Sequence, residues 1–527
     1  MLAGANMQKL DVLGYFHAKL QTGSGHSCVE KIYVTRNLKH PLLGKPAIKA
    51  LKLIECLFEV DDDTNNSEAY REKIFADFPQ LFEGLGHMSG CEYEIRLREN
   101  AQPYSISAPR RIAQPLLPKV KKELDSMEEL GVIRRLDDNE VSDYMSPIVV
   151  VPKKNGKVRI CVDLTKLNEN IIRPRHQLPS VDETLARLGH GKLFSKLDAN
   201  SGFWQVPLAE KSQLLTTFLT PFGRYCHTRL PFGITSGPEF FQQKMDALIK
   251  DLPQATCLID DIAIATPETD AESHRAKLYP VLKKLQDAGV TLNREKCEFF
   301  VSGVEFVGHK ITEHGIKADD KKLAAVRDMP EPQNITELRS FLGLCQQLAK
   351  FSHKLANLIE PLRALLSDKN EFVWAPNHTA AFQEIKTELT SPRVLQPYQP
   401  DKETKIMTDA SRSGFGAILL QKSDKEFHPV CFASKSLSHA EKRYSVIELE
   451  AASIVCACQK LDKYILGVKV SIETDHKPLI SLLDEKNLDR LPPRIVRFRL
   501  ARMRYDSTVK HVPGKENLSD RPAAFCH

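Results

Sequence analysis

The sequence predicts a multidomain protein that combines α/β and α+β architecture. The chain has 527 residues, which is enough for roughly three or four domains. Its composition, 42% hydrophobic and 27% charged residues, is that of globular protein with sizeable cores. Short apolar runs rich in β-branched residues predict strands, and other segments place apolar residues at helical spacing. Two of the expected strands end in acids, at Asp198 and at Asp260-Asp261.

Charge, cysteine content and hydropathy narrow the class of protein. The formal net charge of +6 is a mild basic excess, which is compatible with a nucleic acid partner but not specific for one. The 12 cysteines contain no Cys-X-X-Cys pair, so we expect reduced thiols in an intracellular protein. No apolar run reaches the length of a membrane span, and the N-terminus lacks the features of a signal peptide. We therefore expect no membrane partner.

The paired acids Asp260-Asp261 lie between two short apolar runs, where they predict the tight turn of a hairpin. Burying adjacent carboxylates is costly unless cations neutralise them, and Mg²⁺ prefers oxygen ligands. Alone, the pattern would be an ordinary Asp-Asp turn. Together with Asp198 at the end of another strand, it predicts a two-metal site that stabilises both the attacking and the leaving oxygen of a phosphoryl transfer.

At these residues the chain resembles the reverse transcriptases of gypsy-class (Metaviridae) LTR retrotransposons, as a fragment of their Pol polyprotein. The ordered motifs that carry the resemblance include Phe194–Asp198, Leu230–Gly233, Leu258–Asp261, Asp409–Ser411, Glu473–Asp475 and Pro513–Asp520. The resemblance implies a right-hand polymerase with fingers, palm and thumb. A connection and a ribonuclease H-like mixed-sheet domain would follow.

The resemblance also implies domain boundaries. We expect a partial retropepsin-like segment at 1–57, a linker at 58–98, fingers and palm at 99–317, a thumb at 318–365, a connection at 366–400 and ribonuclease H at 401–527. No Asp-Thr-Gly or Asp-Ser-Gly occurs in the chain, so the segment lacks the catalytic Asp of a protease. An arbitrary leader is the alternative for this segment. We expect no protease activity.

The resemblance implies that Asp198, Asp260 and Asp261 are the catalytic metal ligands of the polymerase. The residues that would bind the incoming dNTP are Lys157, Arg159, Phe203, Phe232, Gly233 and Lys296. Arg159 suits a phosphate because its planar fork binds two oxygens. Phe203 would stack under the deoxyribose and exclude a 2′-hydroxyl, and Lys296 would protonate the leaving pyrophosphate. Ordinary core packing is the alternative for Phe203, and simple solvation is the alternative for the lysines.

A second acidic set follows in the last quarter of the chain. By the resemblance, the catalytic metal ligands of ribonuclease H are Asp409, Glu450, Asp475 and Asp520. Glu448 competes with Glu450 for the helical position. We prefer Glu450 because it directly precedes the small apolar run Ala451-Ala452. Each acid alone would be typical of a surface carboxylate, but the ordered set favours a site.

A basic amphipathic segment precedes the last of these acids. Its arginines are Arg494, Arg497, Arg499, Arg502 and Arg504. An exposed helix face is one interpretation. We prefer a phosphate-contacting face toward the RNA/DNA hybrid, because backbone contacts dominate affinity for nucleic acids.

The resemblance implies a multifunctional enzyme: an RNA-directed DNA polymerase (nucleotidyltransferase) that copies RNA and DNA templates, tethered to a ribonuclease H endonuclease. Each site would use two Mg²⁺ ions, with Mn²⁺ as a substitute. The expected partners are an RNA template, a DNA primer, the RNA/DNA hybrid and dNTPs. A second copy of the chain, forming a homodimer, is a further candidate partner. We expect the enzyme in a cytoplasmic retrotransposon particle, with the nucleus as the alternative compartment.

A second hypothesis is a degenerate or host-adopted remnant that binds nucleic acid without polymerising. Three departures from the family pattern favour it: Leu258 where an aromatic residue is usual, Gln346-Gln347 where paired aromatic residues are common, and Arg521-Pro522 after the last acid. Retention of all seven expected carboxylates argues against it. A third hypothesis is that only one of the two sites is active.

Overall fold

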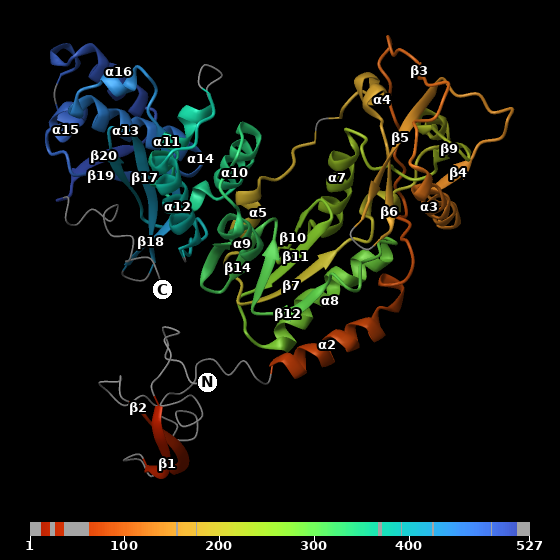
Figure 1. Cartoon of the computed structure of the whole chain (residues 1–527), viewed down its shortest axis with the longest axis horizontal. Coiled ribbons are helices and arrows are strands. Elements are labelled where there is room, and N and C mark those ends of the chain that lie inside the picture. Colours follow the sequence, from red (N-terminus) through yellow and green to blue (C-terminus); the bar gives the residue numbers. More distant parts are fainter. Residues whose placement is uncertain are drawn as a thin grey trace. The chain divides into compact units, whose positions relative to one another are not determined.

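The computed structural model describes residues 12–21, 27–35, 63–153, 156–174, 176–366, 371–391, 393–423, 426–485 and 487–513 (Figure 1). The chain divides into two units, residues 1–72 and 73–527. In the first unit, β1 (Val12–Gln21) and β2 (Ser27–Thr35) form an antiparallel hairpin with Tyr15 opposite Tyr33. Residues 40–51, which carry part of the retropepsin-like expectation, lie outside the described residues.

A mixed sheet and one helix begin the polymerase-like part of the second unit. The strands are β3 (Tyr104–Ser105), β4 (Ile133–Arg135), β5 (Tyr144–Pro152), β6 (Val158–Val162), β8 (Phe218–Thr220) and β9 (Gly223–His227). β5 and β6 pair in antiparallel fashion, with Pro152 opposite Val158. α3 (Leu117–Glu129) buries Val120 and Leu124 in the core, and Gly131 follows it at φ +64°. A glycine there matches the left-handed conformation that commonly ends a helix.

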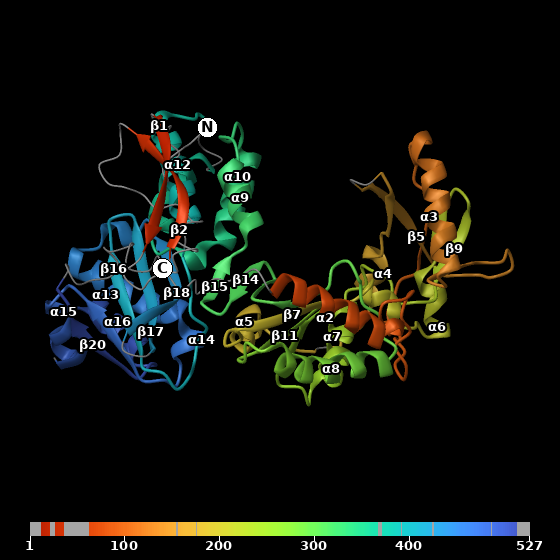
Figure 2. The ribbon, with the colours of Figure 1, turned by 90° about the horizontal axis from the view of Figure 1, so that it is seen from below.

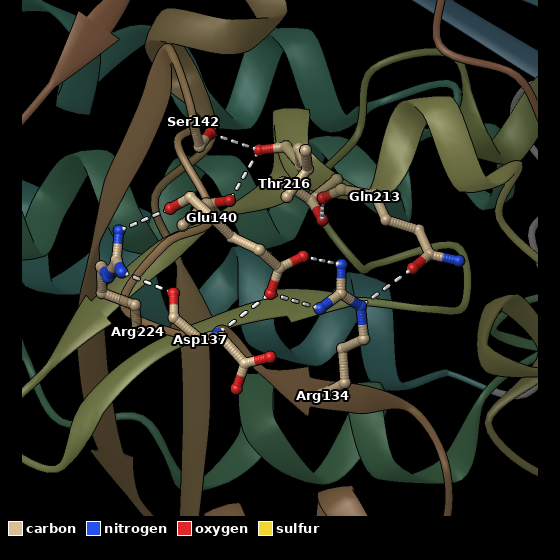
Figure 3. A network of polar contacts seen from close by, with 9 residues as sticks. Arg134, Asp137, Glu140, Ser142, Gln213, Thr216 and Arg224 are labelled. Carbon is tan, nitrogen blue, oxygen red and sulfur yellow. Dashed lines mark hydrogen bonds and ion pairs between the residues drawn. The ribbon is translucent and has the colours of Figure 1, made fainter.

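Two arginines tie the loop between β4 and β5 to this sheet (Figure 3). Arg134 forms a bidentate ion pair with Glu140, at 2.8 and 2.9 Å. Arg224 donates to the carbonyl oxygens of Glu140 (2.9 Å) and Asp137 (2.8 Å). The bonds from Arg134 and from the Asp137 backbone N–H lower the pKa of Glu140 to about 2. Charge-assisted bonds of this kind order a loop that carries little apolar surface of its own.

A four-stranded sheet carries the first pair of acidic motifs. Its strand order is β10 (Ala255–Leu258), β11 (Asp261–Thr266), β7 (Leu193–Asp198) and β12 (Glu298–Val301). α7 (Gly237–Ile249) packs on β10, and α8 (Ala271–Asp287) packs on β7 and β11. The hairpin turn consists of Ile259 and Asp260, because Leu258 pairs with Asp261. The expected Asp260-Asp261 turn is therefore displaced by one residue.

Residues expected to form a linker at 58–98 are largely folded, which corrects that expectation. α2 spans Asp63–Asp77, and Ile74, Leu81 and Tyr93 are buried beyond it. The backbone N–H of His87 donates to the Gly289 carbonyl at 2.8 Å. The polar start of this segment suggested a solvated tether. Its later apolar residues follow no regular period, so the pattern gave no sign that they pack.

A small three-stranded sheet and a group of helices follow the four-stranded sheet and lead to the last sheet of the chain. The elements are β13 (Gly303–Phe306), β14 (His309–Thr312), β15 (Gly315–Ala318), α9 (Asp320–Asp328), α10 (Ile335–Gln347), α11 (Leu355–Arg363) and α12 (Pro376–Thr390). α9 and α10 lie within residues 318–365, the segment expected to form the thumb. α12 lies inside the expected connection 366–400, where it packs on α9 and α11.

A five-stranded mixed sheet forms the last part of the chain, in the order β18 (Glu426–Ser436), β17 (Gly414–Ser423), β16 (Thr404–Ala410), β19 (Val470–Thr474) and β20 (Ser507–His511). β16, β19 and β20 are parallel neighbours, whereas β16, β17 and β18 are antiparallel. α13 (Val446–Lys460) packs on β16 and β17, and on α16 (Pro493–Arg502) (Figure 2). Among the helices of the described ranges, none combines the length and apolar character of a membrane span.

Two buried histidines predict a loss of stability in mild acid. His274 lies between Ser195 and Thr266, with 2.8 Å contacts to both hydroxyls. Burial lowers the pKa of His274 and of His227 from the ordinary 6.5 to about 4. Between these values the unfolded chain binds more protons, so stability present near neutral pH is lost as the pH falls. We expect each histidine to contribute a loss of about 2 kcal/mol between about pH 7 and pH 5.

Thermal unfolding of the whole chain at the two pH values measures this effect. His274→Gln removes the titrating ring and should make the melting temperature less sensitive to acid. His439→Gln is the matched control, because His439 is exposed. An identical pH response in the wild type and His274→Gln would contradict the prediction.

Two candidate acidic sites

Strand pairing brings the three candidate polymerase acids together. In the antiparallel pair of β7 and β11, Asp198 lies directly opposite Asp261. Directly opposed residues of such pairs have Cα atoms about 4.5–5.5 Å apart. Asp260 occupies the adjoining turn, and its carbonyl accepts a bond from the Ala199 N–H at 3.0 Å. The sheet therefore gathers carboxylates from two distant segments at one edge.

The electrostatics of Asp260 fit a cation. Burial is the main cause that raises the pKa of Asp260 to about 6, and the charges of Asp198 and Asp261 add to it. Its Oδ1 atom is buried without a hydrogen-bond partner. A carboxylate with that environment is stabilised by a nearby positive charge. The oxygen donors of the three acids are the type that Mg²⁺ and other hard divalent ions prefer.

Lysines contact the other two acids. Lys296 Nζ lies 3.2 Å from Asp198 Oδ1, and Lys196 Nζ lies 3.2 Å from Asp261 Oδ1. Lys196 also donates to the Glu305 carbonyl at 3.0 Å. Throughout the described ranges, no group of three or more His, Cys, Asp or Glu side chains is arranged to hold a metal ion. In this arrangement, lysine ammonium groups supply part of the positive charge that the acids require.

The backbone at Gly202 closely approaches Asp260. A Cβ atom placed on Gly202 would lie 2.3 Å from Asp260 Oδ1 and 2.9 Å from the Phe241 ring. Only glycine allows backbone to come this near the carboxylate. The sequence interpretation missed both Gly202 and Lys196. Both lie within four residues of Asp198, but the groups that they contact, Asp260 and Asp261, are distant in sequence.

The candidate nucleotide-binding residues fall into two groups. Phe203 is buried, and its ring centroid lies 5.1 Å from that of Phe232, which is 44% exposed. Gly233 follows at φ +97°. These three residues are near one another, and Phe203 directly follows the glycine that approaches Asp260. Lys157 and Arg159 are exposed on the β5–β6 hairpin, apart from the sheet that carries the acids.

The second candidate site lies at the end of two parallel strands. β16 and β19 pair with Met407 opposite Glu473, so Asp409 and Asp475 reach the same edge of the sheet. Glu450 reaches this edge from α13. Burial raises the pKa of Glu450 to about 8, with smaller contributions from Asp475 and Asp409. Its Oε2 atom is buried and lacks a hydrogen-bond partner, so it too fits a cation.

The rival acid Glu448 has a different environment. It accepts bonds from the Ser445 N–H (2.9 Å) and from Arg494 Nη1 (2.6 Å), within a capping box at the start of α13. The Ser445 backbone bond is the main cause that lowers its pKa. Glu448 thus caps the N-terminus of α13, whereas Glu450 faces the other acids. Asp520, the fourth expected ligand, lies outside the described residues.

At least two arginines of the basic segment 494–504 contact protein groups. The expectation that the whole segment forms a phosphate-contacting face is therefore wrong for these two residues. Arg494 pairs with Glu448 and lies 4.3 Å from the Tyr444 ring centroid. Arg502 is buried and donates to the carbonyls of Leu483 and Ser507. These two guanidinium groups face protein partners. Hydrophobic periodicity gave no means to distinguish them from solvent-facing arginines.

Comparisons with known proteins match both acidic regions. Residues 151–311 match the model of the reverse transcriptase (RNA-dependent DNA polymerase) family, and residues 374–472 match that of the RNase H-like domain found in reverse transcriptase. The retrovirus-related Pol polyprotein from transposon opus of Drosophila melanogaster is 30% identical over 510 residues, which cover 92% of this chain and 49% of that protein. The chain thus carries a reverse transcriptase domain and an RNase H-like domain, and over most of its length it is similar to LTR-retrotransposon Pol polyproteins.

Other Pol polyproteins give a similar result. The Pol polyprotein from transposon 412 of Drosophila melanogaster is 33% identical, covering 75% of this chain and 32% of that protein. The transposon Tf2-3 polyprotein of Schizosaccharomyces pombe is 31% identical, covering 82% and 32%. The chain spans half the length of these curated relatives or less. The recognition of a gypsy-class Pol fragment is thereby confirmed.

Solved structures confirm the fold class. A foamy viral protease-reverse transcriptase in complex with double-stranded DNA has a TM-score of 0.74 at 19% identity, covering 97% of this chain and 94% of that chain. A foamy viral protease-reverse transcriptase in complex with RNA/DNA hybrid has a TM-score of 0.72 at 20% identity, covering 98% and 74%. The arrangement of a polymerase followed by a ribonuclease H-like mixed sheet is the one expected from the sequence.

We expect substitution of the two glutamates of α13, Glu450 and Glu448, to have different effects on stability. The pKa of Glu450 is raised to about 8 from the usual 4.5. Between these two pH values the folded chain therefore binds more protons than the unfolded chain. Ionised Glu450 therefore destabilises the metal-free protein as the pH rises toward 8. We expect Glu450→Gln to increase the free energy of unfolding of the metal-free protein near pH 8 by about 1–3 kcal/mol.

Glu448→Gln is the matched control on the same helix. It removes the ion pair with Arg494 and should leave stability unchanged or lower it by less than about 1 kcal/mol. Thermal unfolding in the presence of a chelator measures both variants. If Glu450→Gln melted at or below the wild-type temperature, the buried, unpartnered environment of Glu450 would be refuted.

Proposed function

We propose that this chain is an RNA- and DNA-templated DNA polymerase with a tethered ribonuclease H that cuts the RNA strand of RNA/DNA hybrids. One observation carries the proposal: Asp198 lies opposite Asp261, beside Asp260 and its unpartnered buried oxygen. The similarity to Pol polyproteins over most of the chain supports it. The β16–β19 edge supports the second activity in the same way.

The polymerase acids would hold divalent ions. Asp198, Asp260 and Asp261 are proposed as ligands of two Mg²⁺ ions, for which Mn²⁺ is a substitute. When bound, such ions stabilise the attacking and leaving oxygens of the phosphoryl transfer. Reverse transcriptase and ribonuclease H domains generally depend on divalent metals, and the raised pKa of Asp260 is consistent with a carboxylate that needs one.

Residues around the acids would bind and orient the nucleotide. Lys157 and Arg159, exposed on the β5–β6 hairpin, are proposed to contact the triphosphate. The aromatic pair Phe203 and Phe232 would pack against the sugar and base, with Phe203 excluding a 2′-hydroxyl. Gly233 would let backbone approach the nucleotide closely.

Lys296 would have a separate task. Its ammonium lies at Asp198, so it would lie beside the reacting phosphates of a dNTP held at these acids. We propose that it donates a proton to the departing pyrophosphate.

The ribonuclease H site would use Asp409, Glu450 and Asp475, with Asp520 as the fourth proposed ligand. Glu450 is preferred over Glu448 because the Glu448 carboxylate is already bound by Ser445 and Arg494. Two further divalent ions at this site would activate a water molecule for attack on the RNA strand. The acids themselves fix the edge of the sheet at which the scissile phosphate would lie.

The partners and the domain limits are part of the proposal. The partners are an RNA template, a DNA primer, RNA/DNA hybrid and dNTPs, and a homodimer is a further candidate. We propose fingers and palm at 99–317, a thumb at 318–365, a connection at 366–400 and ribonuclease H at 401–527, preceded by a retropepsin-like segment at 1–57 without a catalytic Asp. Like its Pol relatives, the protein would act inside the cell, in a cytoplasmic particle or in the nucleus.

Reciprocal substitutions test the two activities. Asp260→Asn should reduce primer extension on an RNA template by about 10³-fold or more, because it removes a ligand charge, yet leave hybrid cleavage intact. Glu450→Gln should do the reverse. Primer extension and cleavage of a labelled hybrid, both with Mg²⁺, measure the two effects on one preparation.

Each result has a clear alternative. If the wild type bound hybrid without synthesis or cleavage, the chain would instead be a nucleic-acid-binding remnant. That is the hypothesis favoured by Leu258, which stands where an aromatic residue is usual in the family. Activity in only one assay would assign function to a single site. Equal synthesis by the wild type and Asp260→Asn would refute the assignment of Asp260.

A glycine substitution tests the geometry around Asp260. Gly202→Ala places a methyl group 2.3 Å from Asp260 Oδ1, so the carboxylate must move. We expect primer extension to fall by about 10²-fold, because a displacement near 1 Å misaligns the reacting groups. Gly343→Ala, where nothing lies within 4 Å of the added Cβ, is the control. Equal synthesis by the two variants would show that this approach is unimportant.

A further inference from the structure

The turn that carries Asp260 has an unusual backbone. Ile259, its first residue, has φ +57°. β-Branched residues rarely adopt this left-handed conformation, because their side chain crowds the backbone. The turn therefore needs support from outside the hairpin, and such outliers concentrate where function requires a fixed geometry.

A side chain from α7 supplies that support at the Ile259 N–H, while the Ala199 N–H binds the carbonyl of Asp260. Gln242 is fully buried, and its Oε1 accepts a bond from the Ile259 N–H at 2.7 Å. Its Nε2 donates to the Cys257 carbonyl at 3.0 Å and to Asp246 Oδ1 at 2.8 Å. One amide thus binds the backbone on both sides of Leu258, immediately before the acids.

The orientation of this amide is unambiguous. Reversing it would turn its oxygen toward the Cys257 carbonyl and the Asp246 carboxylate, and its NH₂ group toward the Ile259 N–H. Every one of these pairs would be repulsive, because acceptors would face acceptors and donors would face donors. Asp246 is fixed in turn by His176, whose Nε2 lies 3.3 Å from Oδ2. The bonds therefore form a connected set that ends at the turn.

We propose that Gln242 is a positioning residue that holds the Ile259-Asp260 turn in the geometry required for DNA synthesis. It acts through the backbone and does not touch the substrate. The inference rests on the proposed polymerase function. Without Gln242, the Ile259 N–H and the Cys257 carbonyl lose their buried partner, and Ile259 relaxes toward an ordinary conformation, which displaces Asp260 from Asp198 and Asp261.

The first test measures the turn itself in the metal-free protein. Gln242→Met keeps the volume of the side chain but removes both hydrogen-bonding groups. Gln243→Met is the matched control, since Gln243 is the next residue of α7 and is exposed. Hydrogen–deuterium exchange at the Ile259 amide should be faster by about tenfold or more in Gln242→Met and unchanged in Gln243→Met. Equal exchange in the two variants would overturn the inference.

The second test separates positioning from general destabilisation. Primer extension by Gln242→Met should show a kcat lower by about tenfold or more, with a smaller change in the KM for dNTP. Cleavage of RNA/DNA hybrid by the same preparation should match the wild type, which shows that the chain is folded. A parallel loss of both activities would indicate a merely structural role and overturn the inference.

A second-site substitution makes the test specific for the turn. Glycine adopts positive φ without strain, so in an Ile259→Gly background the turn depends less on its buried partner. Gln242→Met should then lower kcat by at least about threefold less than it does in the wild-type background. An equal loss in both backgrounds would overturn the inference. A wild-type chain that makes no DNA would overturn the proposed function, whereas an active chain insensitive to Gln242→Met would overturn this inference alone.

Discussion

The antiparallel pairing of β7 with β11 is the interaction on which the rest of the polymerase site depends. Because side chains alternate along a strand, a shift of one residue would turn Asp198 or Asp261 to the opposite face of the sheet. Two helices, α7 and α8, cover this sheet and bury its apolar residues, which fixes the register. The energy of the hydrophobic core is thus used to hold like charges near each other.

The elements of this sheet were predictable from sequence because each rests on a local signal. Apolar runs that adjoin acids predicted β7, β10 and β11. The turn was displaced by one residue, since no local rule requires Ile259 at positive φ. That conformation depends on a buried contact with a helix that precedes the hairpin in the chain.

The same reasoning explains which parts of the two sites were missed. The seven candidate acids could be proposed because their residue types and order carry the chemistry. Six of them gather at two sheet edges, and Asp520 lies outside the described residues. Gly202, Lys196 and Gln242 could not be proposed in this way, because their importance lies in distances to groups that are far away in sequence. The folded part of 58–98 was missed for a related reason: its apolar residues pack individually rather than along one face of a regular element.

Lys196 joins two parts of the protein that have different tasks. Its ammonium bridges the Asp261 carboxylate and the Glu305 carbonyl, which belongs to the hairpin of β13 and β14. Movement of that hairpin would pull the ammonium away from the acid and change the local electric field. The small sheet and the acidic edge are therefore coupled through this ammonium as well as through the packing of β13 on β7, so an event that shifts one changes the charge environment of the other.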